Sequence, residues 1–198
     1  MQADKAARSE KRWRVAIVDD HERSRVALRA AIWAAGGDVA GEASRCGDAL
    51  ALVKRVAPDV AIFAAGLPDG DGVSAAAQVT ASASCPVVLF TSHTDAELVE
   101  RARAAGVMAY LLKPLRPAEL APALDLAVAR FAETRELRQT LEARKVIERA
   151  KGALMSRYGL SEEEAFRRLR RAAMDSRRTM VDIAKALLVS ESVVRETP

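Results

Sequence analysis

Short apolar runs alternate with helical stretches over the first 116 residues of the chain. A brief apolar run bounded by turn residues is typical of a strand buried on both faces of a parallel sheet. The pattern predicts strands at 13–18, 39–43, 59–64, 87–90 and 109–112, with helices at 24–35, 47–55, 73–80 and 94–105. This alternation predicts an α/β fold with a doubly wound five-stranded parallel sheet. In such sheets, ligands bind at the carboxyl ends of the strands.

From Pro117 onward the pattern is that of helices alone. Apolar residues recur at steps of four and three along the first, long helix, as in the a/d seam of a coiled coil. The seam consists of Leu120, Leu124, Ala127, Phe131, Leu137 and Leu141. A long helix must bury its apolar stripe, and a second copy of the same helix is the simplest partner, so we expect a parallel homodimer. The other interpretation is that this helix packs back on the domain before it.

Two shorter helices complete the chain. Gly159 interrupts the long helix, and Ser161 with Glu164 forms a capping box that opens the second one. Thr179 with Asp182 caps a third helix that reaches Leu188. The last part of the chain is therefore predicted to be a small three-helix all-α domain.

These patterns divide the chain into a flexible N-terminus at 1–12, an α/β domain at 13–118, a coiled-coil linker helix at 119–140 and a helical domain at 137–198. Residues 1–131 carry 16 Lys and Arg against 16 Asp and Glu, whereas residues 132–198 carry 15 against 11. The whole formal charge of +4 therefore lies in the last third. A basic appendage on a neutral domain favours an anionic partner, nucleic acid first. The other interpretation is a solvated, arginine-rich surface.

Composition excludes several classes of protein. No run approaches the roughly 18 apolar residues that a membrane span needs. The start, Met1–Lys5, lacks the apolar stretch of a secretory signal, so we expect a cytoplasmic protein without a membrane partner. Cys46 and Cys85 form neither a metal-spaced motif nor a disulfide framework.

Polar residues with characteristic chemistry follow the predicted strands. Asp19 and Asp20 end the first strand, and such adjacent carboxylates repel each other unless a cation lies between them. Thr91 follows the fourth strand, and Tyr110 and Lys113 lie in and after the fifth. Residues 13–118 thus resemble a flavodoxin-like receiver domain of two-component systems. The resemblance implies that Asp19 and Asp20 help to hold Mg²⁺, that Thr91 and Lys113 contact a phosphoryl group, and that Tyr110 is the switch aromatic. It also implies a cis peptide bond between Lys113 and the proline that follows.

The chain departs from the receiver pattern at Ala64. Receivers carry the phosphate-accepting aspartate four residues before the loop proline, here Pro68, and that position is Ala64. A methyl group cannot accept phosphate, and we expect none of Asp59, Asp69 and Asp71 to replace the missing carboxylate. We therefore expect a pseudo-receiver with a weakened Mg²⁺ site, no required cofactor and no enzymatic activity. A regulatory protein or ligand would replace phosphorylation.

The C-terminal part resembles the ANTAR domain, the RNA-binding module of the AmiR and NasR antitermination regulators. The match covers about residues 137–190 and rests on Arg144, Ile147, Ala150–Gly152, Leu154–Met155, Ala165–Phe166, Leu169–Arg170 and Asp182–Ala184. The resemblance implies a dimer that binds paired stem-loops in nascent mRNA and favours an antiterminator over a competing terminator hairpin. The expected RNA contacts are Arg144, Lys145, Arg149, Lys151, Arg177 and Arg178.

Two other functions stay open from sequence. Residues 182–194 are similar to a DNA-binding helix-turn-helix, whose second helix would begin near Ser190. That helix would be short, and it would carry Glu191 and Glu196 against Arg195 alone. A protein-interaction adaptor is the third possibility, but it leaves the basic C-terminal part unexplained.

Overall fold

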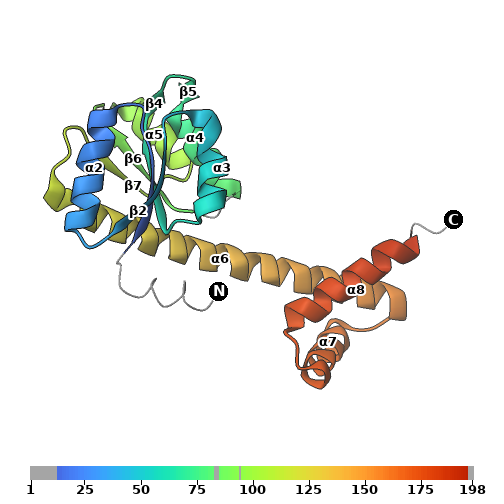
Figure 1. The fold of residues 1–198 in the computed structure, drawn as a ribbon. Helices are drawn as coiled ribbons and strands as arrows, with labels where there is room; N and C mark the ends of the chain where they lie inside the picture. Colours follow the sequence, from blue (N-terminus) through green and yellow to red (C-terminus); the bar gives the residue numbers. More distant parts are fainter. Residues whose placement is uncertain (1–12, 83–84, 94, 196–198) are drawn as a thin grey trace. The chain divides into compact units, whose positions relative to one another are not determined.

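The computed structural model describes residues 13–82, 85–93 and 95–195 (Figure 1). The flexible segment expected at 1–12 and the helix start expected at Thr94 lie outside these described residues. The chain divides into two compact units, residues 1–133 and 134–198.

The first unit contains a parallel five-stranded sheet with the order β2-β1-β3-β6-β7. Its strands are β1 (Arg14–Val18), β2 (Asp38–Ala43), β3 (Val60–Ala64), β6 (Val87–Thr91) and β7 (Ala109–Leu112). The predicted doubly wound fold is confirmed, because the order of strands reverses beside β1. The turn region after β3 adds a small antiparallel pair, β4 (Gly66–Leu67) and β5 (Gly70–Asp71), which the sequence pattern did not predict.

Helices cover both faces of this sheet. They are α2 (Glu22–Ala34), α3 (Cys46–Val56), α4 (Gly72–Ser82), α5 (Ala96–Ala104) and the start of α6 (Pro117–Tyr158). Alternate residues of β1 enter opposite cores because the side chains of a strand alternate between faces. Ala16 and Val18 pack with residues of α3, α4 and α5, whereas Val15 and Ile17 pack with α2 and α6. Figure 1 shows α2 on one side of the sheet and α3 with α4 on the other.

The 42-residue helix α6 confirms the predicted long helix and corrects its predicted seam. Leu120, Leu124 and Ala127 are fully buried in the same core cluster as Ile17 and Leu111. The prediction that these three residues lie between two copies of the helix is therefore wrong. The nearest apolar surface is the sheet of their own domain, and that face would otherwise stay exposed to water.

The rest of the predicted seam lies further along α6, beyond the residues that pack on the sheet. Phe131 is half-buried, whereas the side chains of Leu137 and Leu141 are 66% and 58% exposed. These two leucines are the members of the seam that remain available to a second chain.

The second unit is a three-helix cluster. The end of α6 packs with α7 (Glu162–Ser176) and α8 (Met180–Arg195) around Ala150, Leu154, Ala165, Leu169 and Ala184. The predicted helix ends and caps are confirmed between α6 and α7 and between α7 and α8. Gly159 has a φ of +65°, Ser161 and Glu164 form both bonds of the capping box, and the Asp182 N–H donates to Thr179 Oγ1 at 3.2 Å.

Helix α8 runs without a break from Met180 to Arg195. A helix-turn-helix needs a turn between its two helices, and the sequence placed that turn just before Ser190. The described residues 188–190 are helical instead, which counts against the DNA-binding alternative. Among the residues that the structure describes, no helix combines the length and the apolar character needed to cross a bilayer.

Candidate functional site

Four adjacent strands bring the predicted receiver residues to one edge of the sheet. Asp19 directly follows β1, Ala64 ends β3, Thr91 ends β6 and Lys113 follows β7. Ala64 is paired in register with Phe90, the neighbour of Thr91. The Lys113 backbone N–H donates to the Thr91 carbonyl oxygen at 2.8 Å. These contacts place a receiver-type site at the carboxyl ends of the strands.

An ion pair between Asp19 and Lys113 occupies the centre of this site. Asp19 is only 1% exposed, and its Oδ2 accepts a hydrogen bond from Lys113 Nζ at 2.7 Å. The Oδ1 atom accepts from the backbone N–H of His21 at 2.9 Å. Lys113 Nζ also lies 5.0 Å from the centroid of the Phe90 ring, a cation–π distance. The charge of the buried carboxylate is thus balanced within the chain.

Three residues after β1 carry atoms of the kind that can bind a metal ion. Ligand atoms of Asp19, Asp20 and His21 lie within 4.8 Å of one another. Both Asp19 oxygens are already engaged, and Asp20 Oδ1 lies 2.7 Å from His21 Nδ1. Ala64 offers no oxygen from its side chain, although Mg²⁺ demands near-octahedral oxygen coordination. This arrangement does not fit Mg²⁺ well. The contacts of His21 with Asp19 and Asp20 could not be predicted from the sequence pattern.

The backbone around Ala64 is tightly constrained although its side chain is inert. Ala64 is buried, and the Gly72 N–H donates to the Ala65 carbonyl oxygen at 2.8 Å. A Cβ atom at Gly72 would lie 1.9 Å from the Ala64 carbonyl oxygen, so a larger residue cannot stand there without moving the backbone. The turn after β3 therefore depends on glycine at this position.

The nearby aspartates have other partners. Asp69 accepts hydrogen bonds from the backbone N–H groups of Gly47 and Cys46, which hold the pKa of its carboxyl below the ordinary value. Asp71 Oδ2 lies 2.6 Å from Arg101 Nη2.

At the far end of its strand, the Asp59 carboxylate accepts from the Arg14 N–H at 2.8 Å. Asp59, Asp69 and Asp71 are thus each held by groups that lie outside the Asp19–Lys113 pair.

A hollow of about 320 Å³ beside the site is lined by Asp71, Thr91 and Arg101, among others.

Two further receiver residues occupy the expected strand positions. Thr91 is buried, and its hydroxyl accepts from the His93 N–H at 3.1 Å. The Tyr110 side chain is 54% exposed at the surface of β7. The peptide bond between Lys113 and Pro114 is cis, as predicted.

The predicted RNA-contacting residues of the second unit differ in accessibility. Arg144, Arg149, Arg177 and Arg178 are exposed, and Lys145 is exposed but paired with Glu142 at 2.8 Å. Lys151 is buried, and its ammonium lies 2.9 Å from Glu148 and 2.7 Å from Glu162. Those carboxylates, Glu162 first, raise the pKa of Lys151, and Lys151 in turn lowers the pKa of Glu162.

A stacked aromatic group also lies in this unit. The Arg168 guanidinium is 4.8 Å and that of Arg157 is 5.5 Å from the centroid of the Tyr158 ring, and Tyr158 is half-exposed. Sequence reasoning missed this group because Arg168 belongs to a different helix.

This chain combines a receiver-like α/β domain with a basic helical unit. These two parts together place it in the class of response regulators.

Comparisons with known proteins agree with this class. The family model of the response regulator receiver domain matches residues 15–125, and that of the ANTAR domain matches residues 135–188. The transcriptional regulatory protein PdtaR of Mycobacterium tuberculosis is 38% identical over 191 residues, which cover 93% of each chain. The chain therefore belongs to the response regulators that combine a receiver domain with a C-terminal ANTAR domain.

Further relatives match one part of the chain each. The nitrate regulatory protein of Klebsiella oxytoca is 48% identical over 62 residues, which are 31% of this chain and 16% of that protein. Among solved structures, the receiver domain of the putative response regulator NarL from Mycobacterium tuberculosis has a TM-score of 0.55 and 33% identity. That match covers 59% of this chain and 97% of the other, which agrees with the receiver fold of the first unit.

Proposed function

We propose that this protein is a transcription antitermination regulator that binds paired stem-loops in nascent mRNA as a dimer. The match of residues 135–188 to the ANTAR domain is the observation that carries the proposal. The surplus of basic residues in the same unit supports it, because RNA phosphates attract arginine and lysine. Such a regulator acts in the cytoplasm, where transcripts are made.

The proposed RNA surface consists of exposed cations. Arg144 and Arg149 lie on α6, and Arg177 and Arg178 lie in the turn between α7 and α8. Arginine can pair with a phosphate and stack on an unpaired base, both of which occur in RNA loops. Lys145 belongs to this surface more weakly because it is paired with Glu142. Lys151 is left out of the phosphate-binding set, since two carboxylates already neutralise its buried charge.

Dimerisation is proposed through the exposed part of α6. Leu137 and Leu141 are four residues apart on one face of the helix and project large apolar side chains into solvent. A second copy of the helix would bury them. The interface is shorter than the sequence suggested, because the first half of the predicted seam is used inside the receiver unit.

We further propose that phosphorylation at the usual receiver position does not control this protein. Ala64 supplies no nucleophile, and Lys113 is paired with Asp19. Control would come from a regulatory protein or a ligand that binds the receiver unit. No catalytic step is assigned to the chain, and no metal is required for the proposed activity.

Binding to RNA and to DNA at the same stated salt concentration tests the proposed function. The full chain should bind a two-stem-loop RNA more tightly than duplex DNA of equal length, and single hairpins more weakly than the pair. Combined replacement Arg177→Ala and Arg178→Ala should weaken binding and lower the slope of log affinity against log salt. Arg103→Ala, on an exposed receiver residue, is the control. Equal affinity for RNA and duplex DNA would contradict the proposal.

A further inference from the structure

The outward face of α2 is apolar, although the solvent face of a surface helix is usually polar. On this face Trp33 is 79% exposed and Val26 is 49% exposed. At about 100° per residue, the exposed positions of the face span roughly 120° of the helix. This face, the α2 stripe, consists of Arg23, Val26, Ala27, Ala30, Trp33 and Ala34. Arg23 is the single charged member of the stripe.

The other charged residues of α2 lie on one flank of the helix, where they pair with β2. Glu42 Oε2 lies 3.1 Å from Arg25 Nε, and Glu42 Oε1 lies 2.7 Å from Arg29 Nη1. Glu22 pairs with both of these arginines. These charges are balanced within the receiver unit, and they leave the α2 stripe exposed.

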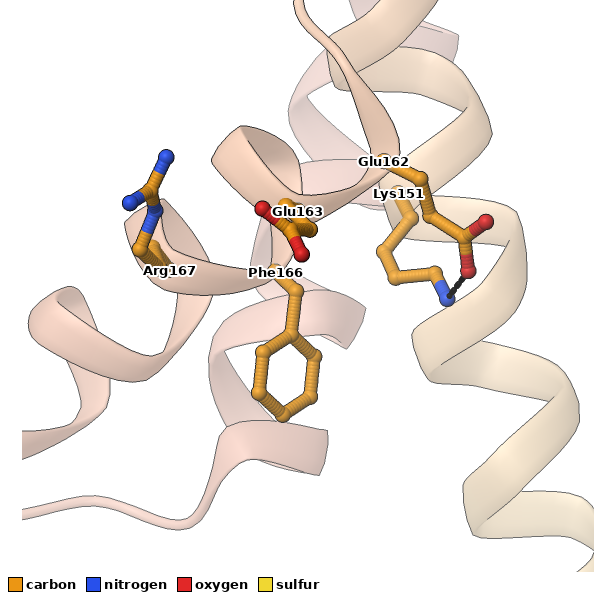
Figure 2. Close-up of a pocket in the computed structure, with 5 residues that line it drawn as sticks. All are labelled: Lys151, Glu162, Glu163, Phe166 and Arg167. Atoms are coloured by element: carbon orange, nitrogen blue, oxygen red, sulfur yellow. Dashed lines mark hydrogen bonds and ion pairs between the residues drawn. The ribbon is translucent and has the colours of Figure 1, made fainter.

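Phe166, an exposed aromatic residue of the second unit, has different surroundings. It is 39% exposed and shares a pocket with the charged side chains of Lys151, Glu163 and Arg167 (Figure 2). Trp33 lies instead on a helix face whose other members are mainly small and apolar. Tryptophan is enriched at protein interfaces, where its burial contributes much of the binding energy. The α2 stripe is therefore suited to contact with another apolar protein surface.

The α2 stripe is complementary to itself when two copies pair antiparallel about a two-fold axis at Ala30. Residues at similar distances before and after Ala30 then meet, provided that they lie on the same side of the stripe. Trp33 covers Val26 of the second copy, and Ala34 meets Ala27 of the second copy. Each contact occurs twice, as two-fold symmetry requires. Alanine at the crossing point lets the two helices approach closely.

Charge at the helix ends favours the same antiparallel arrangement. The last turn of α2 carries no basic residue, so no side chain of that turn offsets the partial negative charge of its C-terminal carbonyl groups. Arg23 lies seven residues before Ala30, and in the antiparallel pair it reaches the C-terminal end of the second helix. A cation at that end is stabilising. A parallel pair would instead place two Arg23 side chains together, where like charges repel.

We propose that the α2 stripe binds the α2 stripe of a second copy of this chain. The contact does not depend on the proposed RNA binding or on the exposed leucines of α6. Stable interfaces use about 20–30 residues on each side, whereas this stripe offers six. The contact should therefore be weak by itself and should form when the local concentration of the protein is high.

Disulfide cross-linking of the full chain tests this pairing. Cys46→Ser removes the half-buried thiol and Cys85 is buried, so an introduced surface cysteine is the accessible one. Ala30→Cys places two thiols at the proposed two-fold axis, and mild oxidation should give a covalent dimer on a non-reducing gel.

The matched control is Ala34→Cys, which changes an exposed alanine of the same helix. In the proposed pair, the two copies of this residue would lie about 12 Å apart along the helix axis. That distance exceeds the roughly 7 Å that a disulfide allows between Cα atoms. We therefore expect Ala34→Cys to cross-link at least about tenfold more slowly than Ala30→Cys.

Charge introduced into the α2 stripe should prevent the contact. Trp33→Arg in the Ala30→Cys chain removes the largest apolar side chain and adds like charges, so it should slow cross-linking about tenfold or more. Leu126→Arg makes the same kind of change at a 44% exposed leucine of α6 and should leave the rate unchanged. Because Trp33 is exposed, the variant should keep its fold, which far-UV circular dichroism checks.

Three results would overturn the proposal. The first is equal cross-linking of Ala30→Cys and Ala34→Cys, and the second is a rate that Trp33→Arg leaves unchanged. The third concerns the Leu137→Arg, Leu141→Arg chain, which lacks the proposed α6 interface. Ala30→Cys should still cross-link in that chain at millimolar concentration, and a chain that stays monomeric there would leave the stripe to a different protein.

Discussion

Replacing Lys113 by methionine should destabilise the receiver unit strongly. The change removes the cation paired with Asp19 and leaves a carboxylate that is 1% exposed, with His21 as its other partner among the described residues. Removing one partner of a buried ion pair costs roughly 3–5 kcal/mol of unfolding free energy. The Lys113 side chain is 24% exposed, so we expect a loss of about 3 kcal/mol, at the lower end of that range.

Urea denaturation followed by tryptophan fluorescence measures this loss. The chain has two tryptophans, Trp13 in the core and Trp33 at the surface, and both lie in residues 1–133. In a Trp33→Phe background, the buried Trp13 is the single tryptophan whose fluorescence is followed. Arg103→Met is the control, because the Arg103–Glu100 pair has a similar length of 2.8 Å but lies in solvent. Exposed pairs of this kind contribute about 0–1 kcal/mol.

A double-mutant cycle completes the test. Combining Lys113→Met with Asp19→Asn removes both charges, so much of the lost stability should return, and the coupling energy should exceed about 1 kcal/mol. If Lys113→Met unfolds at the same urea concentration as Arg103→Met, the pair does not balance a buried charge.

Four other changes have clear expected outcomes. Acetyl phosphate should leave no acyl phosphate on the wild-type chain by intact mass, whereas Ala64→Asp should gain one; a wild-type label mapped to Asp69 would contradict this. The hydrogen bonds that lower the pKa of Asp69 stabilise the folded state at pH values above 3.8, the ordinary pKa of the group. This stabilisation is lost as the pH falls through the lowered pKa. The urea midpoint of Asp69→Asn should therefore fall below that of the wild type at pH 7 and approach it in acid, and a constant difference would refute the reasoning. Ser161→Ala removes a capping-box bond and should cost the second unit about 1 kcal/mol, read from faster amide exchange in the first turn of α7. Wild-type protein should sediment as a dimer at micromolar concentration and the double variant Leu137→Arg, Leu141→Arg as a monomer; a monomeric wild type would end the dimer proposal.

The receiver fold was predictable because each strand is a short apolar run that ends in a polar residue. The position of Ala64 followed from counting back from Pro68, and the helix junctions followed from Gly159 and Ser161. These are local signals, and they act over a few residues. The sequence therefore predicted the elements and the strand-end site well.

The errors concern contacts between distant parts of the chain. The spacing of Leu120 and Leu124 is the same whether a helix packs on a sheet or on its own copy, so the pattern cannot choose between these partners. Lys151 was expected to contact RNA because it lies among the basic residues at the end of the long helix. Its burial depends on Glu162, which lies eleven residues away on another helix. Pairing of this kind requires the fold, and spacing along one helix does not encode it.

The close approach of Gly72 to the Ala64 carbonyl has a genetic consequence. The backbone at the end of β3 is held by glycine and by strand pairing, and it does not depend on the side chain at position 64. An alanine codon can become an aspartate codon by a single nucleotide change, and the turn would need no second substitution to present the new carboxylate. Where the Ala64 codon is one of those that differ from an aspartate codon by one nucleotide, a single point mutation would place the usual aspartate of receivers at this position. The glycine that shapes the turn would not have to change with it.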